Sequence, residues 1–339
     1  MGYIGPVLIQ HLKRVFPGVT IIGFDTGFFA GCLVDSNVFP ETIVDLQYFG
    51  DVRNMPESVF EGVDAVIQLA AVSNDPMGNQ FEQPTREINE LAAVKIAGVA
   101  KKNGVKNFVF ASSCSVYGAG GTDAKKEQDS LNPQTAYAKS KINAEVGLSE
   151  LADENFLVTS LRFATACGFS SRLRLDLVLN DFVASAVKAG KIEILSDGSP
   201  LRPLIHVKDM ALAMEWASVR TMDQGGTNLI VNAGSNEFNY QIKELAYQVR
   251  DTIGNVEVSI NTQASPDTRS YKVNFDYFKS LAPDHYPKMS LVDAIKELYD
   301  GISKSPSINR DFRHSHFIRL TTLRELLGQQ RMNEQLFWN

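Results

Sequence analysis

The feature that most constrains the fold is an alternation of strand-like and helix-like segments in the first half of the chain. Residues 19–25, 64–71 and 107–110 are short apolar runs typical of buried strands. Helical patterns occupy residues 7–13 and 89–102, with no internal repeat or low-complexity linker between the segments. Strands that alternate with helices predict a parallel sheet covered on both faces. We therefore expect an α/β, Rossmann-like doubly wound fold.

Two segments near the middle of the chain carry residues suited to alcohol oxidation. Ser113 follows the third strand-like run, and open α/β sheets bind ligands at the carboxyl ends of their strands. Tyr137 and Lys141 are four apart in a helical pattern, so both lie on one helix face. A lysine one turn away favours the phenolate of tyrosine, whose ordinary pKa is about 10. The alternative is a buried Ser–Tyr hydrogen bond beside a solvated lysine.

The amino terminus matches part of a phosphate-binding glycine turn. Met1-Gly2-Tyr3-Ile4-Gly5 runs directly into a helical pattern. Gly2 and Gly5 match the second and third glycines of G-x-x-G-x-x-G, so residues 2–5 are expected to contact a dinucleotide pyrophosphate. We expect the first glycine and the first strand of the sheet to lie before Met1. The alternative is an unusual natural start in which another segment fills the gap.

The ends of two strand-like runs add candidate cofactor contacts. Asp25 would accept hydrogen bonds from the adenosine ribose and repel a 2′-phosphate, which favours NAD over NADP. The alternative is an acidic turn residue without a ligand. Leu69, Ala70 and Ala71 end a run whose small residues would let its backbone approach the pyrophosphate and the nicotinamide ribose.

Composition limits the class of protein. The chain of 339 residues can form one large domain or two lobes, and its net charge of −6 without a basic tract argues against nucleic acid. No apolar run reaches the roughly 18–20 residues of a membrane span, and no signal peptide is recognisable. Three widely spaced cysteines and five scattered histidines indicate a reducing cytoplasm, with neither a disulfide framework nor a metal site.

Taken together, these motifs resemble the extended short-chain dehydrogenase/reductase family of nucleotide-sugar epimerases, dehydratases and reductases. The resemblance runs from Met1 to about Asn309, and its most specific part is Ser-Ser-x-x-Val-Tyr-Gly followed by Tyr-x-x-x-Lys. It implies that Ser113 and Tyr137 form a proton-relay pair. It also implies that Lys141 holds the nicotinamide ribose and tunes the tyrosine, with NAD as the cofactor and a nucleotide-diphosphate sugar as the substrate.

The resemblance extends to further contacts with the cofactor. Residues 49–53 resemble the family segment G-D-x-R, whose acid contacts the adenine amine, so Asp51 and Val52 are expected at the cofactor together with Asn89.

Arginines outside the cofactor half point to the substrate. Arg174, Arg202 and Arg269 are separated in sequence and suit a diphosphate, the alternative being solvated surface arginines. The segment that begins at Arg202 resembles the family's R-x-Y-I-H-V-x-D, whose arginine holds the diphosphate. Thr165 and Asn180 complete the expected substrate contacts, although the family more often has Asn where Thr165 stands.

The chain is expected to divide into two lobes and a tail. These are an NAD-binding domain (1–167, with 204–232 returning to it), a smaller α/β substrate-binding lobe (168–203 and 233–309) and a helical tail (310–339). Four leucines at helical spacing in the tail should pack on the main body or on a second subunit: Leu320, Leu323, Leu326 and Leu327. The helices at 89–102 and 137–151 should lie side by side and, as in the family, pair across a two-fold axis into a homodimer.

The residues after Ser113 bear on the reaction. Dehydratases of the family carry Asp-Glu directly after the relay residue, whereas this chain has Cys114 and Ser115, which disfavours dehydration. Epimerisation at C4 requires only that a 4-keto sugar rotate before hydride returns. We therefore expect an NAD-dependent nucleotide-sugar C4 epimerase of polysaccharide or glycoconjugate synthesis. The alternatives are a dehydrogenase or ketoreductase of the same family, and a non-catalytic binding protein on this fold.

Overall fold

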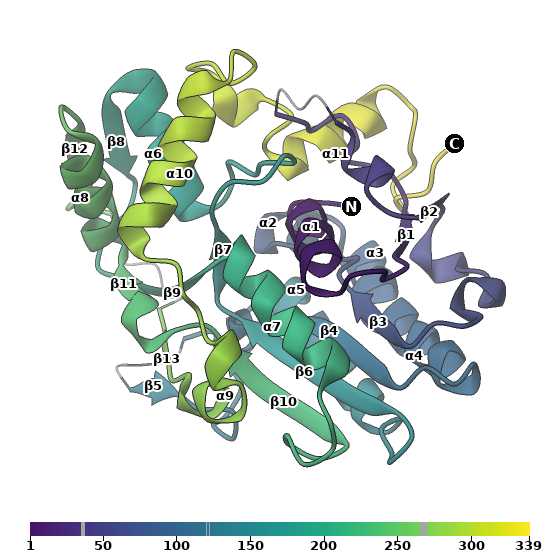
Figure 1. The fold of residues 1–339 in the computed structure, drawn as a ribbon. Helices are drawn as coiled ribbons and strands as arrows, with labels where there is room; N and C mark the ends of the chain where they lie inside the picture. The colour runs from purple at the N-terminus through teal and green to yellow at the C-terminus, as the bar shows by residue number, and fades with distance from the viewer. Residues whose placement is uncertain (35–37, 120, 122, 265–269) are drawn as a thin grey trace.

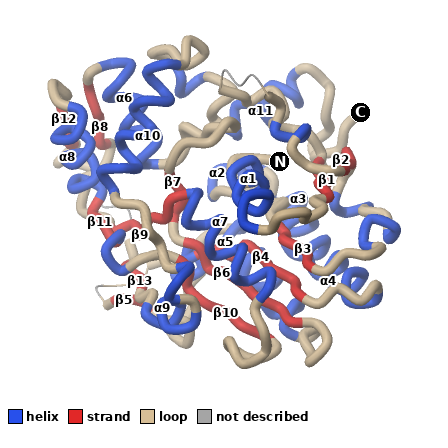
Figure 2. The backbone as a smooth tube through the Cα atoms, in the orientation of Figure 1, coloured by secondary structure: helices blue, strands red, loops and turns tan. Residues whose placement is uncertain are grey.

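The computed structural model describes residues 1–34, 38–119, 121, 123–264 and 270–339. At its centre is a parallel sheet of order β10-β6-β4-β3, drawn as red strands in Figure 2. Its strands are β3 (Ala65–Gln68), β4 (Asn107–Ser113), β6 (Leu157–Phe163) and β10 (Asn228–Ala233). The register aligns Gln68 with Phe110 and Ser113 with Phe163, so the carboxyl ends of these strands share one edge of the sheet.

A second, two-stranded parallel sheet lies beside the first and consists of β1 (Ile22–Asp25) and β2 (Leu46–Phe49). Among the described residues, β1 is not hydrogen bonded to β3. Among the described residues, the first element is helix α1 (Gly5–Val15). The α/β class and the parallel strand pairing predicted from the sequence are confirmed.

Helices cover both faces of the central sheet. Helix α7 (Val207–Val219) passes in front of the strands in Figure 1, with α1 packed beside it. Helix α5 (Ala136–Ser149) lies behind the strands and packs against α4 (Ala93–Lys102) and the π-helical turn Glu87–Ala92. Strands with helices on both sides become buried on both faces, and every residue of β6 is buried.

The remaining part of the fold combines short sheets with three helices that pack on one another. Its helices are α6 (Val178–Ala189), α8 (Ile242–Ile253) and α10 (Leu291–Lys304). The strands pair as β7-β9-β11, β8-β12 and β5-β13. Their bounds are β5 (Ala124–Lys125), β7 (Thr165–Cys167), β8 (Lys191–Ile194), β9 (Leu201–His206), β11 (Asn239–Gln241), β12 (Glu257–Ile260) and β13 (Lys272–Val273). The remaining helices are α2 (Asp75–Gln80), α3 (Glu82–Arg86), α9 (Asp276–Leu281) and α11 (Arg319–Gly328).

The C-terminal residues pack onto the main body. Leu323 and Leu326 of α11 join a buried cluster with Val52 and Ile96, and Leu320 and Leu327 pack against it. The leucine stripe therefore packs on the chain itself, one of the two outcomes expected. The tail is helical over only part of its length, because α11 ends at Gly328 and a non-helical turn follows. Among the helices described, none is long and apolar enough to cross a membrane.

Candidate active site

A cavity of about 1560 Å³ lies between β1 and the carboxyl ends of the central strands. Its lining includes all of β1 and all of β3, so part of this space is the gap between these two strands, which do not pair with each other in the described part of the chain, and the rest reaches the carboxyl ends of the central strands. Most of the residues predicted from the sequence line it: Gly2, Tyr3, Ile4, Gly5, Asp25, Asp51, Val52, Leu69, Ala70, Ala71, Ser113, Tyr137, Lys141, Thr165, Arg174 and Arg202. Asn89 and Asn180 are not among the lining residues, and Arg269 lies outside the described residues.

Ser113, Tyr137 and Lys141 meet on one wall of this cavity. Ser113 is the last residue of β4, and its hydroxyl accepts a hydrogen bond from the Ser115 N–H (3.2 Å). Tyr137 lies in the first turn of α5, which begins where the Thr135 hydroxyl accepts a hydrogen bond from the backbone of that turn. Lys141 follows one turn later, and its Nζ lies 5.6 Å from the centre of the Tyr137 ring. A strand end and a helix start therefore position the three groups.

The Tyr137 hydroxyl is less acidic than the sequence suggested. Desolvation raises the pKa of Tyr137 to about 12, although a side-chain hydrogen bond with Ser113 lowers it. The charge of Asp75 raises this pKa further, and the charge of Arg174 lowers it. The structure thus differs from the expectation that Lys141 acidifies the tyrosine.

Lys141 is itself perturbed by its surroundings. Its side chain is only 3% exposed, and burial lowers the pKa of its ammonium group to about 7, against an opposing effect of Glu145. Its Nζ donates a hydrogen bond to the Ala111 carbonyl (2.7 Å). At neutral pH the lysine is therefore only partly charged, and its charge is not among the main influences on the pKa of Tyr137.

The predicted phosphate turn lies at the amino terminus of α1. Ile4, which caps this helix, makes no side-chain hydrogen bond to the first turn, and the turn contains no acidic residue. The helix dipole at this end favours negative charge, although Pro6 in the first turn has no N–H to donate. The Tyr3 side chain serves the fold, since its hydroxyl donates to the Gly168 carbonyl (2.6 Å).

The two predicted adenosine contacts lie at the ends of β1 and β2. Asp25 ends β1, and its carboxylate accepts hydrogen bonds from the Gly27 N–H (2.6 Å) and from the amino group of Met1. Asp51 follows β2 and is paired with Arg53, whose Nη2 lies 2.6 Å from Asp51 Oδ2. Both carboxylates line the cavity but already have partners within the chain.

The described arginines predicted for a diphosphate also line the cavity. Arg174 makes a bidentate pair with Asp176, with both N···O distances 2.9 Å, and its third nitrogen donates to Ser73. Arg202 begins the segment that forms β9, and its guanidinium carbon lies 5.8 Å from the Tyr271 ring centre. A diphosphate would meet Arg174 as one half of a buried ion pair, while the Arg202 guanidinium also donates to the Leu201 carbonyl (2.8 Å).

Asn89 and Asn180 are placed differently from the prediction. Both are fully buried, and their amides brace the walls of the cavity. Asn89 accepts from the Val72 N–H (2.8 Å) and donates to the Val72 carbonyl (3.0 Å). Asn180 accepts from the Gly168 N–H (3.0 Å) and donates to the Tyr3 hydroxyl (3.0 Å). They hold the loop after β3 and the phosphate turn in place, and neither lines the cavity.

Sequence reasoning missed a buried ion pair under the wall that carries Ser113, Tyr137 and Lys141. The side chains of Glu145 and Arg162 are buried, with exposures of 3% and 4%. Glu145 Oε2 lies 2.7 Å from Arg162 Nη2. Glu145 also accepts from the Ser112 hydroxyl (2.5 Å), next to Ser113. In the sequence, Glu145 is marked only by its position four residues after Lys141. The pair itself is not visible there, because Glu145 lies on helix α5 and Arg162 on strand β6.

Ser115 is a second residue whose place the sequence alone did not give. Ser115 lines the cavity, and its buried Oγ has no hydrogen-bond partner among the described residues. Gly118 closes the same segment with a φ of +58°, and a Cβ there would lie 1.9 Å from the Asn132 carbonyl oxygen. The glycine of the motif is thus required by the backbone.

The fold and this cavity define the class of nucleotide-binding α/β enzymes that act at the carboxyl ends of a parallel sheet. The chain belongs to the NAD dependent epimerase/dehydratase family, whose sequence model matches residues 1–234. It is similar to the UDP-glucose 4-epimerase of Corynebacterium glutamicum, with 26% identity over 288 residues that cover 79% of this chain and 83% of that protein.

Solved structures share the fold at lower identity. A UDP-glucose-4-epimerase from Stenotrophomonas maltophila with bound NAD and formylated UDP-arabinopyranose matches with a TM-score of 0.74 and 20% identity, over 89% of this chain and 95% of that chain. The NAD-dependent NDP-hexosamine 5,6-dehydratase TunA matches with a TM-score of 0.76 and 19% identity, over 91% and 96%. Because an epimerase and a dehydratase share this fold, the fold alone does not choose the reaction.

Proposed function

We propose that the chain is an NAD-dependent nucleotide-sugar epimerase that inverts C4 through a 4-keto sugar. The observation that carries the proposal is the meeting of Ser113, Tyr137 and Lys141 on one wall of a cavity that Arg174 and Arg202 also line. The curated relatives that act as UDP-glucose 4-epimerases support the same reaction.

The residues present fit NAD. The first turn of α1 carries no acidic residue, Asp25 ends β1, and the buried Ser115 hydroxyl at the other end of the cavity lacks a protein partner among the described residues. Residues 2–5 would hold the pyrophosphate, Asp25 the adenosine ribose and Lys141 the nicotinamide ribose. When bound, NAD supplies a ring that accepts hydride from the sugar carbon and later returns it.

The side chains of the site would move the proton. The phenolate form of Tyr137 would take the proton of the C4 hydroxyl group of the sugar and become the phenol, and Ser113 would hold the sugar oxygen through a hydrogen bond. Since burial raises the pKa of Tyr137 to about 12, a positive charge beside the ring is needed to make the phenolate accessible. Arg174 supplies part of this charge, and protonated Lys141 would supply more. After the keto sugar turns its other face, Tyr137 returns the proton.

The residues after Ser113 favour epimerisation over dehydration. The Cys114 thiol is buried, donates to the Arg162 carbonyl (3.0 Å) and has a pKa raised by burial, so it cannot act as an acid or base on a sugar. Ser115 offers a hydroxyl where an elimination would need a carboxyl group. A dehydrogenase or ketoreductase uses the same relay, but it would leave NADH or consume it.

The test is a screen of nucleotide sugars by proton NMR with NAD present. The proposal predicts that at least one UDP-sugar converts to its C4 epimer and that the Tyr137→Phe variant does not catalyse the conversion. Accumulation of an oxidised sugar with NADH would replace the epimerase with a dehydrogenase. Absence of conversion together with absence of NAD binding would favour a non-catalytic protein.

Assembly and location are part of the proposal. Leu91 and Val146, on the neighbouring π-helical turn and α5, are 47% and 56% exposed, which supports a homodimer through α4 and α5. A dimer mass in light scattering at micromolar concentration is expected, and a monomer mass would contradict it. We also propose the division into NAD-binding and substrate lobes given above, and the cytoplasm as the location, which the free, buried cysteines support.

A further inference from the structure

Residues 331–339 form a closed turn that we call the C-terminal clasp. The Asn333 side chain accepts hydrogen bonds from the N–H groups of Gln335 (3.0 Å) and Phe337 (3.1 Å). The Asn333 N–H in turn donates to the Phe337 carbonyl (2.9 Å). An asparagine that bonds the backbone after it stabilises a tight turn, so the clasp has a defined shape of its own. Figure 1 places it beside β1 and β2.

The tip of the clasp is Leu336, which is held in an unusual backbone conformation. Its φ is +55°, a region that residues with a branched side chain rarely adopt. Its side chain is nevertheless 1% exposed and belongs to the same buried cluster as Val52. Leu336 also lines the cavity, as do Asp51 and Val52. Burial of the apolar Leu336 side chain at this wall offsets the strain in its backbone.

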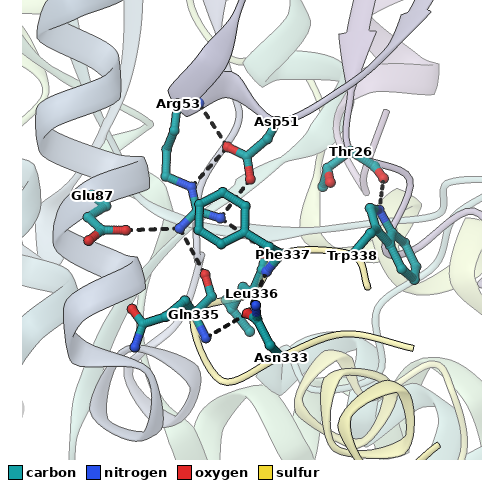
Figure 3. Close-up of polar contacts among 9 residues, drawn as sticks. All are labelled: Thr26, Asp51, Arg53, Glu87, Asn333, Gln335, Leu336, Phe337 and Trp338. Atoms are coloured by element: carbon teal, nitrogen blue, oxygen red, sulfur yellow. Dashed lines mark hydrogen bonds and ion pairs between the residues drawn. The ribbon is translucent and has the colours of Figure 1, made fainter. Parts of the chain in front are cut away.

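Arg53 fixes the clasp to the segment after β2 (Figure 3). Its guanidinium donates to the carbonyls of Gln335 (2.8 Å) and Leu336 (3.0 Å), and it lies 3.5 Å from the centre of the Phe337 ring. The same guanidinium holds both carboxylate oxygens of Asp51. One side chain thus couples the clasp to the acid that faces the cavity.

Trp338 provides a second attachment, at the end of β1. Its Nε1 donates to the Thr26 carbonyl (2.7 Å), and its ring centre lies 5.1 Å from that of Phe28. Figure 3 shows this bond to Thr26, the residue that directly follows Asp25 in the sequence. The clasp therefore spans the ends of β1 and β2. Asp25 is the last residue of β1, and Asp51 follows shortly after β2.

We propose that the clasp closes the adenosine end of the cavity and that NAD leaves only after the Arg53 and Trp338 attachments break. The proposal rests on the cofactor placement proposed above. Leu336 supplies an apolar wall for the adenine ring, and Arg53 holds Asp51 in position toward it. A cofactor that is returned unchanged in each turnover can remain bound, so slow release is compatible with epimerisation.

The test measures the release of NADH by stopped flow, with excess NAD as the chase. The variant Phe337→Ala/Trp338→Ala removes the ring under Arg53 and the bond to Thr26, while neither side chain lines the cavity. We expect NADH to leave about tenfold faster or more, from the loss of a hydrogen bond and two aromatic contacts. The control is Tyr299→Ala, on α10, whose exposure of 42% matches the 41% of Trp338.

Two further measurements keep the result interpretable. Trp338→Phe keeps an aromatic ring at this position but loses the hydrogen bond to Thr26. It should speed the release of NADH about fivefold, which corresponds to the net free energy of about one hydrogen bond. In a Trp216→Phe background, Trp338 is the one remaining tryptophan, and bound NAD should protect it from acrylamide quenching.

The outcomes separate the clasp from the cofactor assignment. If NADH fails to bind to the unaltered chain, the cofactor assignment and the clasp both fail. If NADH binds but leaves both variants at the rate of the unaltered chain, the clasp proposal is wrong and the cofactor assignment stands.

Discussion

Replacing Lys141 by methionine should stabilise the protein while abolishing its activity. The buried ammonium group has a pKa of about 7, compared with the usual 10.5. At pH 6 this difference corresponds to roughly 5 kcal/mol against the folded state, since each unit of pKa is worth about 1.36 kcal/mol. The hydrogen bond to the Ala111 carbonyl is lost in the variant, and an unsatisfied carbonyl costs about 1–3 kcal/mol. The Lys141→Met variant should therefore gain about 2–4 kcal/mol at pH 6.

The gain should depend on pH in a defined direction. Between about pH 7 and pH 10.5 the unfolded lysine is protonated while the folded one is neutral, so the unaltered protein becomes more stable as the pH rises. The advantage of the Lys141→Met variant should then shrink to zero between about pH 8.5 and pH 10, and near pH 10 the variant should be the less stable protein, because the unsatisfied carbonyl remains. Urea unfolding followed by circular dichroism at pH 6, 8 and 10 measures this. Lys139→Met, at an exposed position on the same helix, is the control and should change little.

The reasoning is refuted if Lys141→Met is less stable than the unaltered protein at pH 6. A gain that stays constant from pH 6 to pH 10 would equally contradict it, because the effect would then not arise from titration of the lysine.

Three other substitutions test the site. Tyr137→Phe should lower turnover by about 100-fold or more with an unchanged melting curve, and turnover near that of the unaltered enzyme would remove the tyrosine from proton transfer. Asp25→Asn should narrow the preference for NAD over NADP, measured by calorimetry; equal affinities of the unaltered chain for both would contradict its role. Glu145→Gln leaves buried Arg162 without its counter-charge and should lower the free energy of unfolding by about 3–5 kcal/mol. A loss below about 1 kcal/mol in urea unfolding would show that the pair is dispensable.

The parts of the site that could be predicted depend on short-range spacing. Tyr137 and Lys141 are one helical turn apart, and Ser113 ends an apolar strand, so local periodicity was sufficient to bring them to one wall. The parallel sheet followed from the same periodicity. Charge and glycine spacing also placed residues 2–5 and Asp25 at the cavity, which they line.

What could not be predicted depends on burial and on contacts between distant segments. The sequence does not show that the side-chain amides of Asn89 and Asn180 are hydrogen bonded to the backbone of other segments. It does not show the clasp, because Arg53 and Leu336 are 283 residues apart. The pKa values of Tyr137 and Lys141 likewise follow from desolvation, which only the packed structure defines.

The measurement that tests the central claim most directly is the fate of the hydrogen at C4. A UDP-sugar substrate of the NMR screen, deuterated at C4, is incubated with the protein and NAD, and the product is analysed by NMR and mass spectrometry. The 4-keto mechanism, with Tyr137 moving only the proton, predicts that the C4 epimer retains the deuterium and that no reduced cofactor accumulates. Loss of the deuterium to water, or its accumulation in reduced cofactor beside an oxidised sugar, would contradict the account.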